Sequence, residues 1–334
     1  MKKNSPFSAI TYKETGLRHI KKGKGCEDNV YYTFSDESGV KVITLSDGAG
    51  SYSNAAIGSE LSSRIAGDFI AEKFDLLFDL DRETTGEFIL HEILSTLNAL
   101  ANKSGNDLLS YSATLLCAAF HPDGRYILFH VGDGAIVGLN MNNKCETISI
   151  YDHDGPANQA TFVTVENTDF FLKKGVNEYI SFVLMSDGPE DFLVNELEVN
   201  PRVNLMIQLS FFVSESNMME QLASLIRLLK EKGMGDDTSF ALLNDTRYTS
   251  VVFNSLNPEL RATLFDLGSD IGTKKLKIAS DVLDIIALSE NGATIKQIYR
   301  QLHVHSEKNA KKKVEFLIKM NLIERINGKY YIAK

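Results

Sequence analysis

The chain has 334 residues, and its 44 Asp and Glu against 35 Lys and Arg give a formal net charge of −9. At about 150 residues per domain this length suggests two domains, and 43% hydrophobic residues are enough for ordinary cores. No apolar stretch approaches the length of a membrane span, and no signal-peptide core follows the N-terminus. The three cysteines are too few and too scattered for a disulfide framework. We therefore expect a soluble, cytoplasmic protein.

Charge separates the chain into two parts. Residues 274–334 hold 13 Lys and Arg against 6 Asp and Glu, a balance of +7, which leaves 22 minus 38, or −16, for residues 1–273. The acidic part can recruit cations. The basic part needs another explanation.

The predicted elements of the acidic part are short apolar strands and longer amphipathic helices. In chain order, strands are predicted at 40–46, 112–120, 125–131, 134–139, 180–186 and 238–243. Helices are predicted at 54–74, 87–102 and 217–232, the first because Ile57, Leu61, Ile65 and Phe69 recur every four residues. These elements indicate an α+β fold in which a two-sheet β-sandwich is flanked by helices.

Acidic residues at the ends or starts of apolar runs are the main functional signal. Carboxylates gathered from several strand ends suit a hard divalent cation, because Mg²⁺ and Mn²⁺ prefer several oxygen ligands. This pattern predicts a metal-dependent hydrolase. The acidic clusters are Glu27-Asp28, Asp47-Gly48, Asp187-Gly188 and Asp236-Asp237.

For any single Asp-Gly pair, a turn is the stronger interpretation, because Asp-Gly is a common hairpin sequence. Asp123-Gly124, between two apolar runs, is interpreted as a turn, and Asp154-Gly155 as a loop. Only the joint pattern of the acidic clusters favours a role as metal ligands.

Six short motifs in order resemble the metal-dependent protein serine/threonine phosphatases of the type 2C family, and of its bacterial branch in particular. Each motif is weak alone, but six in this order across residues 16–243 are specific. The motifs are Gly25-Cys26-Glu27-Asp28-Asn29, Leu45-Ser46-Asp47-Gly48-Ala49-Gly50-Ser51, Tyr111-Ser112-Ala113-Thr114-Leu115-Leu116, Val131-Gly132-Asp133-Gly134-Ala135, Leu184-Met185-Ser186-Asp187-Gly188 and Gly235-Asp236-Asp237-Thr238-Ser239.

The resemblance implies a four-layer αββα fold, two Mg²⁺ or Mn²⁺ ions as cofactors, and roles for named residues. It implies that Asp47 bridges the two ions with the Gly48 carbonyl as a further ligand, and that Asp187 and Asp236 hold the second ion. It implies that Glu27 and Asp28 act mainly through metal-bound waters, and that Asp133 matches a position for a third, weaker ion in some members. The catalytic residues would then be Asp47, Asp187 and Asp236.

The reaction implied by the resemblance is hydrolysis of phosphoserine or phosphothreonine in proteins. Two cations a few ångströms apart can lower the pKa of a bridging water and neutralise charge on the phosphoryl oxygens. The chain then needs little nucleophile chemistry of its own, and it has neither a G-x-S-x-G elbow nor a Cys in a basic anion loop.

Two departures from the family pattern concern substrate binding. The family's phosphate-binding arginine lies a few residues before Glu-Asp, whereas Arg18 precedes Glu27 by nine positions. Arg18, His19 or a lysine such as Lys24 could bind the phosphate. Ala49 stands where many relatives have a histidine that protonates the leaving group, so that proton has to come from water or another side chain.

The basic part resembles a winged helix-turn-helix domain. Apolar spacing predicts three helices, and short strands at 322–326 and 330–332 enclose the hairpin pair Asn327-Gly328. We therefore predict a phosphatase-like domain at 1–245, a connector at 246–273 and a winged-helix-like domain at 274–334. The third helix would present four lysines to nucleic-acid phosphates, or to solvent or a protein partner. These are Lys308, Lys311, Lys312 and Lys319.

Three functional classes remain open at this point. The first is the metal-dependent phosphatase acting on a phosphorylated protein, with residues 274–334 binding a nucleic acid or a protein partner. The second is a DNA-binding regulator whose phosphatase-like domain senses a ligand without catalysis. The third is a scaffold with a degenerate site, and the presence of all the core acidic positions argues against it.

Overall fold

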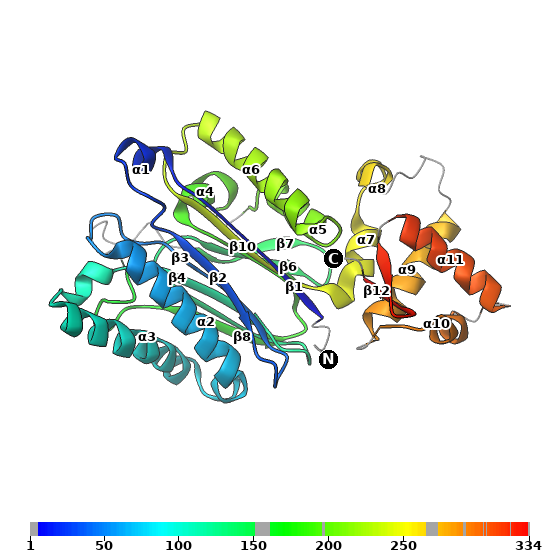
Figure 1. Ribbon diagram of the computed structural model, residues 1–334, viewed down its shortest axis with the longest axis horizontal. Helices are drawn as coiled ribbons and strands as arrows, with labels where there is room; N and C mark the ends of the chain where they lie inside the picture. Colours follow the sequence, from blue (N-terminus) through cyan, green and yellow to red (C-terminus); the bar gives the residue numbers. More distant parts are fainter. Residues whose placement is uncertain are drawn as a thin grey trace. The chain divides into compact units, whose positions relative to one another are not determined.

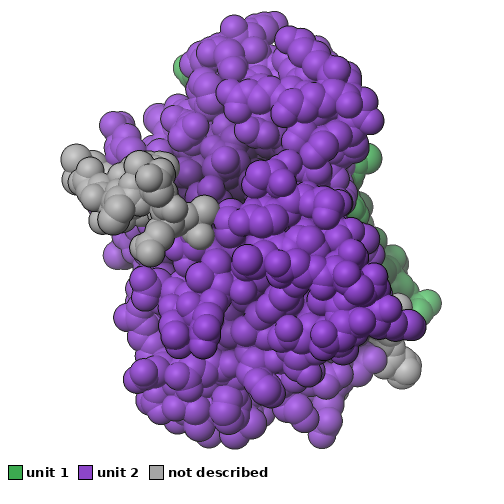
Figure 2. All heavy atoms as spheres, turned by 90° about the vertical axis from the view of Figure 1, so that its left-hand side faces the viewer, with its two compact units in different colours: residues 1–8, 208–218, 244–334 green, residues 9–207, 219–243 purple. Residues whose placement is uncertain are grey.

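The computed structural model describes residues 6–150, 161–195, 198–264, 273–289, 292–302, 304, 306–320 and 322–332. The chain divides into two compact units (Figure 2), a larger one of residues 9–207 and 219–243 and a smaller one of residues 1–8, 208–218 and 244–334. The domain boundaries at 245 and 273 stay a prediction, and residues 265–272 of the connector lie outside the described residues.

Two five-stranded, mainly antiparallel sheets make up the centre of the fold (Figure 1). The first has the strand order β1-β10-β9-β6-β7, with bounds Phe7–Glu14, Thr238–Asp245, Tyr179–Met185, Ala135–Asn140 and Cys145–Ile150. The second has the order β2-β3-β4-β5-β8, with bounds Asn29–Phe34, Lys41–Ser46, Leu115–Phe120, Arg125–Val131 and Phe171–Val176.

The two sheets pack face to face through their aromatic side chains. Every residue of β4 and β9 is buried, which explains why these strands are continuous apolar runs. The rings of Phe120 and Phe182 stack with centroids 4.6 Å apart, and the Tyr126 ring lies 5.4 Å from Phe182. The interior of the sandwich is therefore a closed apolar core.

Two long helices cover the outer face of the second sheet. Helix α2 (Ala55–Asp79) packs on β2, β3 and β4, and α3 (Arg82–Ser104) packs on α2. The side chain of Asp81 caps the N-terminus of α3, and Gly105, with φ of 69°, ends it. Both helices run longer than the predicted 54–74 and 87–102. Their buried side chains include Ile70, Phe74, Ile89, Ile93 and Leu97.

Shorter helices belong to the other side of the sandwich. Figure 1 draws α4 (Asp187–Leu193) and α6 (Glu215–Glu231) on the side away from α2 and α3. Helix α1 (Leu17–Lys21) precedes β2, and α5 (Pro201–Ser210) lies between α4 and α6 in the chain. The predicted α+β fold, a two-sheet sandwich flanked by helices, is confirmed.

The smaller unit contains helices and one hairpin. Its apolar core includes Phe253, Val282, Leu283, Ile298, Val314, Leu317 and Tyr330. Its elements are a 3₁₀ turn at Thr246–Tyr248, α7 (Thr249–Ser255), α8 (Pro258–Leu264), α9 (Thr273–Ala287), α10 (Ile295–Gln301), α11 (Glu307–Lys319), β11 (Ile323–Ile326) and β12 (Lys329–Ile332). A second 3₁₀ turn, Leu108–Tyr111, belongs to the larger unit.

Among the described helices, none combines the length and the apolar character that crossing a bilayer requires.

Candidate functional site

Most of the predicted site residues line one cavity of about 300 Å³ in the larger unit. They come from the end of β3, the β5–β6 turn, the start of α4 and the segment before β10, elements that are far apart in the sequence. The predicted residues that line it are Arg18, His19, Asp47, Gly48, Asp133, Asp187 and Asp236. Lys22, Ala49, Gly50, Thr114 and Phe162 complete the lining.

Asp47 follows the last residue of β3 and is fixed there through its backbone. The Asp47 N–H donates to the Thr114 hydroxyl at 2.9 Å, and the Thr114 N–H donates to the Asp47 carbonyl at 2.9 Å. Gly48 follows in a close-packed position, because a Cβ there would lie 2.8 Å from the Glu27 carbonyl and from the Ala55 backbone. Thr114 is therefore a positioning residue for Asp47.

Burial and mutual repulsion raise the pKa of the carboxyl groups in this cluster. Burial, followed by the negative charges of Asp28, Asp187 and Asp133, holds the pKa of Asp47 well above its ordinary value. Burial and the charges of neighbouring carboxyls, Asp133 first, raise the pKa of Asp187 to about 7.

Asp28 is 1% exposed and belongs to the same cluster although it does not line the cavity. Burial raises its pKa to about 6, although the Ser239 hydroxyl donates to its Oδ2 at 2.7 Å. Its Oδ1 has no hydrogen-bond partner among the described residues. A buried carboxylate oxygen without a partner is costly, and a cation or an ordered water would satisfy it.

Asp133 sits between two glycines in the turn from β5 to β6. Gly132 and Gly134 have φ of 89° and 94°, which favour glycine. A Cβ on Gly132 would lie 2.7 Å from the Thr114 side chain, and one on Gly134 would lie 2.6 Å from the Met185 carbonyl. The turn therefore places the Asp133 side chain in the cavity, and residues larger than glycine would not fit on either side of it in the chain.

Asp237 organises the loop that carries the predicted phosphate-binding residues. Its Oδ1 accepts the Gly16 N–H at 2.6 Å, and its Oδ2 accepts the Glu27 N–H at 2.6 Å. Its Oδ2 also lies 2.8 Å from Nδ1 of His19. The sequence pointed to Asp236-Asp237 as a pair, but the role of the second carboxylate as the anchor of residues 16–27 was missed.

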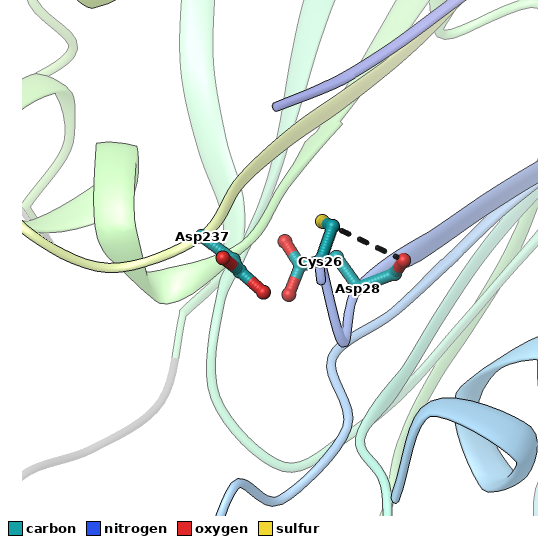
Figure 3. A group of neighbouring side chains, drawn as sticks. All are labelled: Cys26, Asp28 and Asp237. Carbon is teal, nitrogen blue, oxygen red and sulfur yellow. Dashed lines mark hydrogen bonds between the residues drawn. The ribbon is translucent and has the colours of Figure 1, made fainter. Parts of the chain in front are cut away.

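Asp237 and Asp28 also form a small group with Cys26. Figure 3 shows the two carboxylates pointing toward each other while the Cys26 sulfur points to the Asp28 carbonyl, which it meets at 3.8 Å. Burial raises the pKa of the Cys26 thiol to about 12, so it is protonated at neutral pH. A protonated thiol is a poor metal ligand.

The three candidate phosphate-binding residues have different environments. Arg18 is largely exposed, lines the cavity and meets Asp236 Oδ2 at 3.0 Å. His19 is held between Asp237 and Glu27, with Nε2 3.4 Å from Glu27 Oε2. Lys24 does not line the cavity; it meets Glu27 Oε1 at 2.9 Å and the Gly50 carbonyl at 3.2 Å.

Glu190, in the first turn of α4, is a buried acid that sequence reasoning missed. It is 2% exposed, and its Oε2 has no hydrogen-bond partner among the described residues. Burial raises its pKa to about 8, with further contributions from nearby negative charges, including Asp133 and Asp187. The only signal in the sequence was its position three residues after Asp187 on a helix, which places both on neighbouring turns.

The donor set fits a hard divalent cation. It consists of carboxylate and carbonyl oxygens from separate elements, with raised pKa values that a bound positive charge would reverse. The unpartnered Oδ1 of Asp28 gives the same indication from hydrogen bonding.

Comparison with known proteins identifies the family. The model of the family "Protein phosphatase 2C" matches residues 15–227, more than half of the chain. The chain therefore belongs to the protein phosphatase 2C family. This membership places it among the metal-dependent serine/threonine phosphatases. A comparison with curated protein sequences finds no match.

Solved structures share the fold at low sequence identity. The S. agalactiae serine/threonine phosphatase has a TM-score of 0.51 at 19% identity, with 71% of this chain and 99% of that chain covered. The catalytic domain of the serine/threonine phosphatase PstP, solved in complex with two manganese ions, has a TM-score of 0.51 at 18% identity, covering 71% of this chain and 97% of that one. A mutant of a bacterial serine phosphatase also has a TM-score of 0.51, at 19% identity with 71% and 98% covered.

Proposed function

We propose that the chain removes phosphate from phosphoserine and phosphothreonine of proteins with two Mg²⁺ or Mn²⁺ ions. Asp47, the Gly48 carbonyl, Asp187 and Asp236 would hold the ions directly. Glu27 and Asp28 would contribute from the second layer, and Asp133 would serve a third ion. The observation that carries this proposal is the convergence of strand-end carboxylates with raised pKa values around one cavity.

The chemistry that the two ions supply when bound is a lowered pKa for the attacking water and positive charge beside the phosphoryl oxygens. The carboxyl groups of Asp28 and Asp187 would lose their protons as the ions bind, because a nearby positive charge favours the carboxylate. Asp47 stays oriented by its backbone hydrogen bonds with Thr114.

Arg18 is the phosphate-binding residue that the geometry favours among the three candidates. Its guanidinium is held at the cavity by Asp236 and is exposed enough to reach a ligand. A guanidinium fork suits phosphate oxygens. His19 and Lys24 are engaged by carboxylates of the loop, and we assign them the positioning of Glu27 and of residues 16–27.

The proton for the leaving seryl or threonyl oxygen has to come from elsewhere than residue 49. Ala49 lines the cavity with a methyl group, which has no proton to give. Water admitted to the open cavity would supply it. If water supplies the proton, the rate should depend more strongly on the pKa of the leaving group than it would with a positioned side-chain acid.

The test is phosphatase activity on phosphoserine and phosphothreonine peptides with Mn²⁺, with Mg²⁺ and with EDTA. We expect activity only with metal, and a loss of more than about 100-fold in Asp47→Asn and Asp187→Asn. Asp123→Asn is the matched control, because Asp123 is also followed by glycine but pairs with Arg125 in a turn. Metal-replete wild type without activity on diverse phosphopeptides would remove the proposal's main support.

A non-catalytic sensor domain attached to a DNA-binding regulator is the second candidate. It would need a ligand site without a complete set of metal ligands, whereas the core acidic positions are all present here. A nucleic-acid partner is compatible with catalysis, so binding to DNA would not by itself favour this candidate.

A further inference from the structure

Helix α11 of the smaller unit presents a row of lysines on its outward face. At about 100° per residue, Lys308, Lys312 and Lys319 lie within about 40° of one another around the helix axis. All three side chains are exposed. Glu315 is the acidic residue on the same row, and Lys311 flanks it. The opposite face of α11 carries Ala310, Val314 and Leu317, which are buried.

This row belongs to a segment with a strong excess of positive charge. Residues 292–332 contain nine Lys and Arg against three Asp and Glu. None of the α11 lysines forms an ion pair with a carboxylate among the described residues. Like charges held on one face repel each other, and a polyanion would relieve that repulsion. The charge pattern therefore favours a partner with many regularly spaced negative charges.

The hairpin that follows α11 carries one further exposed cation. Strands β11 and β12 pair from Ile323↔Ile332 to Ile326↔Lys329 and turn at Asn327-Gly328. Arg325 is exposed and lies over the Tyr330 ring, 5.8 Å from its centroid.

The hairpin is joined to the segment between α9 and α10 by an isolated β-bridge. Ala293, between α9 and α10, exchanges both backbone hydrogen bonds with Tyr330, at 3.0 and 2.8 Å. Helix α11 packs against α9, α10 and β11. These contacts hold the backbone of α11 in place, so the spacing of its lysines does not have to be set on binding.

We propose that the lysine row of α11, made of Lys308, Lys312 and Lys319, binds the phosphate backbone of duplex DNA. Lys308 and Lys319 are eleven residues apart, about 16 Å along a helix. The B-DNA major groove is about 12 Å wide and admits an α-helix, so lysines at both ends of α11 reach the phosphates on its two sides. The deep, narrow major groove of duplex RNA does not admit a helix. The three side chains are cations that would contact phosphates, so the binding should be largely independent of sequence.

The experiment measures binding of the full-length chain to a fluorescent 24-base-pair duplex of random sequence by anisotropy, from 50 to 200 mM KCl. We expect affinity to fall steeply with salt, because each phosphate contact contributes a slope of about −0.9 in log K against log salt. The variant Lys308→Ala/Lys312→Ala/Lys319→Ala should lose about 2.7 from that slope, three contacts at about 0.9 each. We also expect its affinity at 100 mM KCl to fall at least about tenfold.

Two matched variants make the result specific. Lys103→Ala/Lys144→Ala/Lys232→Ala removes the same charge from exposed positions in the larger unit and should bind DNA like the wild type. The triple arginine variant of the α11 lysines keeps the charge and should retain binding. Thermal melting, and phosphatase activity in the absence of DNA, should be unchanged in all three variants, since all the substituted lysines are exposed and alanine and arginine suit the helix α11.

Three results would overturn the proposal. The first is no binding of the wild type at 50 mM KCl. The second is an equal loss in the α11 alanine variant and the larger-unit control, which would indicate non-specific attraction by net charge. The third is binding to duplex RNA or to polyglutamate, an acidic polypeptide, with equal or higher affinity than to DNA, which would assign the surface to a different polyanion.

Discussion

Replacing Asp187 by asparagine should stabilise the metal-free protein while abolishing its metal-dependent activity. Burial and the neighbouring carboxyls raise the pKa of Asp187 from 3.8 to about 7. A shift of about 3 units at 1.36 kcal/mol per unit sets an upper limit of about 4 kcal/mol at pH 8. We expect the stabilisation to be about half of this limit, about 2 kcal/mol, because protonation of neighbouring carboxyls in the wild type already relieves part of the repulsion.

The sign follows from proton binding. Between about pH 4 and pH 7, the folded state holds a proton on Asp187 that the unfolded state has lost, so the free energy of unfolding decreases as pH rises through this window. Asparagine carries no such proton. The gain in the free energy of unfolding of Asp187→Asn over the wild type should therefore reach its full value at pH 8 and be about a third as large at pH 5.

The assay is thermal unfolding in EDTA at pH 5 and pH 8. A gain of about 2 kcal/mol corresponds to a rise in Tm of about 4–8 °C for a unit of this size. Asp123→Asn is the control: burial alone would raise the pKa of Asp123, but hydrogen bonds from Arg125 and pairing with His121 and Arg125 lower it. The control should lose stability at pH 8. An Asp187→Asn variant that melts below the wild type at pH 8, or whose gain is the same at pH 5, would refute the electrostatic reasoning.

Three further predictions concern the metal, the loop and the core. Calorimetric titration should show Mn²⁺ binding more weakly at pH 5.5 than at pH 8, with protons released on binding. The reason is that Asp28 and Asp187 have pKa values of about 6 and about 7. An Mn²⁺ affinity independent of pH would contradict those shifts. Asp237→Ala should destabilise the fold by about 2–4 kcal/mol in chemical denaturation, because it leaves the N–H groups of Gly16 and Glu27 without their acceptor. Asp237→Asn should lose less stability. Equal losses in the two variants would argue against the hydrogen bonds as the cause. Phe182→Ala should cost about 3–5 kcal/mol, because it opens a cavity between the sheets; a cost below about 1 kcal/mol would show that the sandwich core collapses around the gap.

The strands that the sequence predicted are the inner strands of the two sheets, and the strands that it missed are the edges. Inner strands such as β4 and β9 are buried along their whole length and stand out as apolar runs. The missed strands, β1, β2, β7 and β8, each lie at an edge of a sheet and are only partly buried. A partly exposed edge strand carries a weaker hydrophobic pattern, and tertiary pairing rather than local composition defines it.

The turns were predictable because their chemistry is local. Asp123-Gly124 forms the turn that the sequence indicated, with Gly124 at φ of 96° and its N–H donating to the His121 carbonyl at 2.9 Å. Asn327-Gly328 joins β11 and β12 as expected, with φ of 50° and 79°. Both pairs have conformations that the residue types favour without help from distant contacts.

The cavity residues could be proposed from motif order, but their division of labour could not. The anchoring role of Asp237 depends on Gly16 and Glu27, more than two hundred residues away. The burial of Glu190 depends on how α4 packs, and no local pattern records it. Contacts at this separation are set by the fold as a whole, so a residue's position in the chain does not reveal them.

Anomalous diffraction from crystals grown with Mn²⁺ is the sharpest test of the two-ion site, because it locates ions without an assay of function. We expect two peaks in the cavity, with oxygens of Asp47, Gly48, Asp187 and Asp236 at about 2.0–2.2 Å from them. Both peaks should weaken in Asp47→Asn crystals. Strong Mn²⁺ peaks elsewhere with none beside Asp47, or an empty cavity at millimolar Mn²⁺, would contradict the two-ion site.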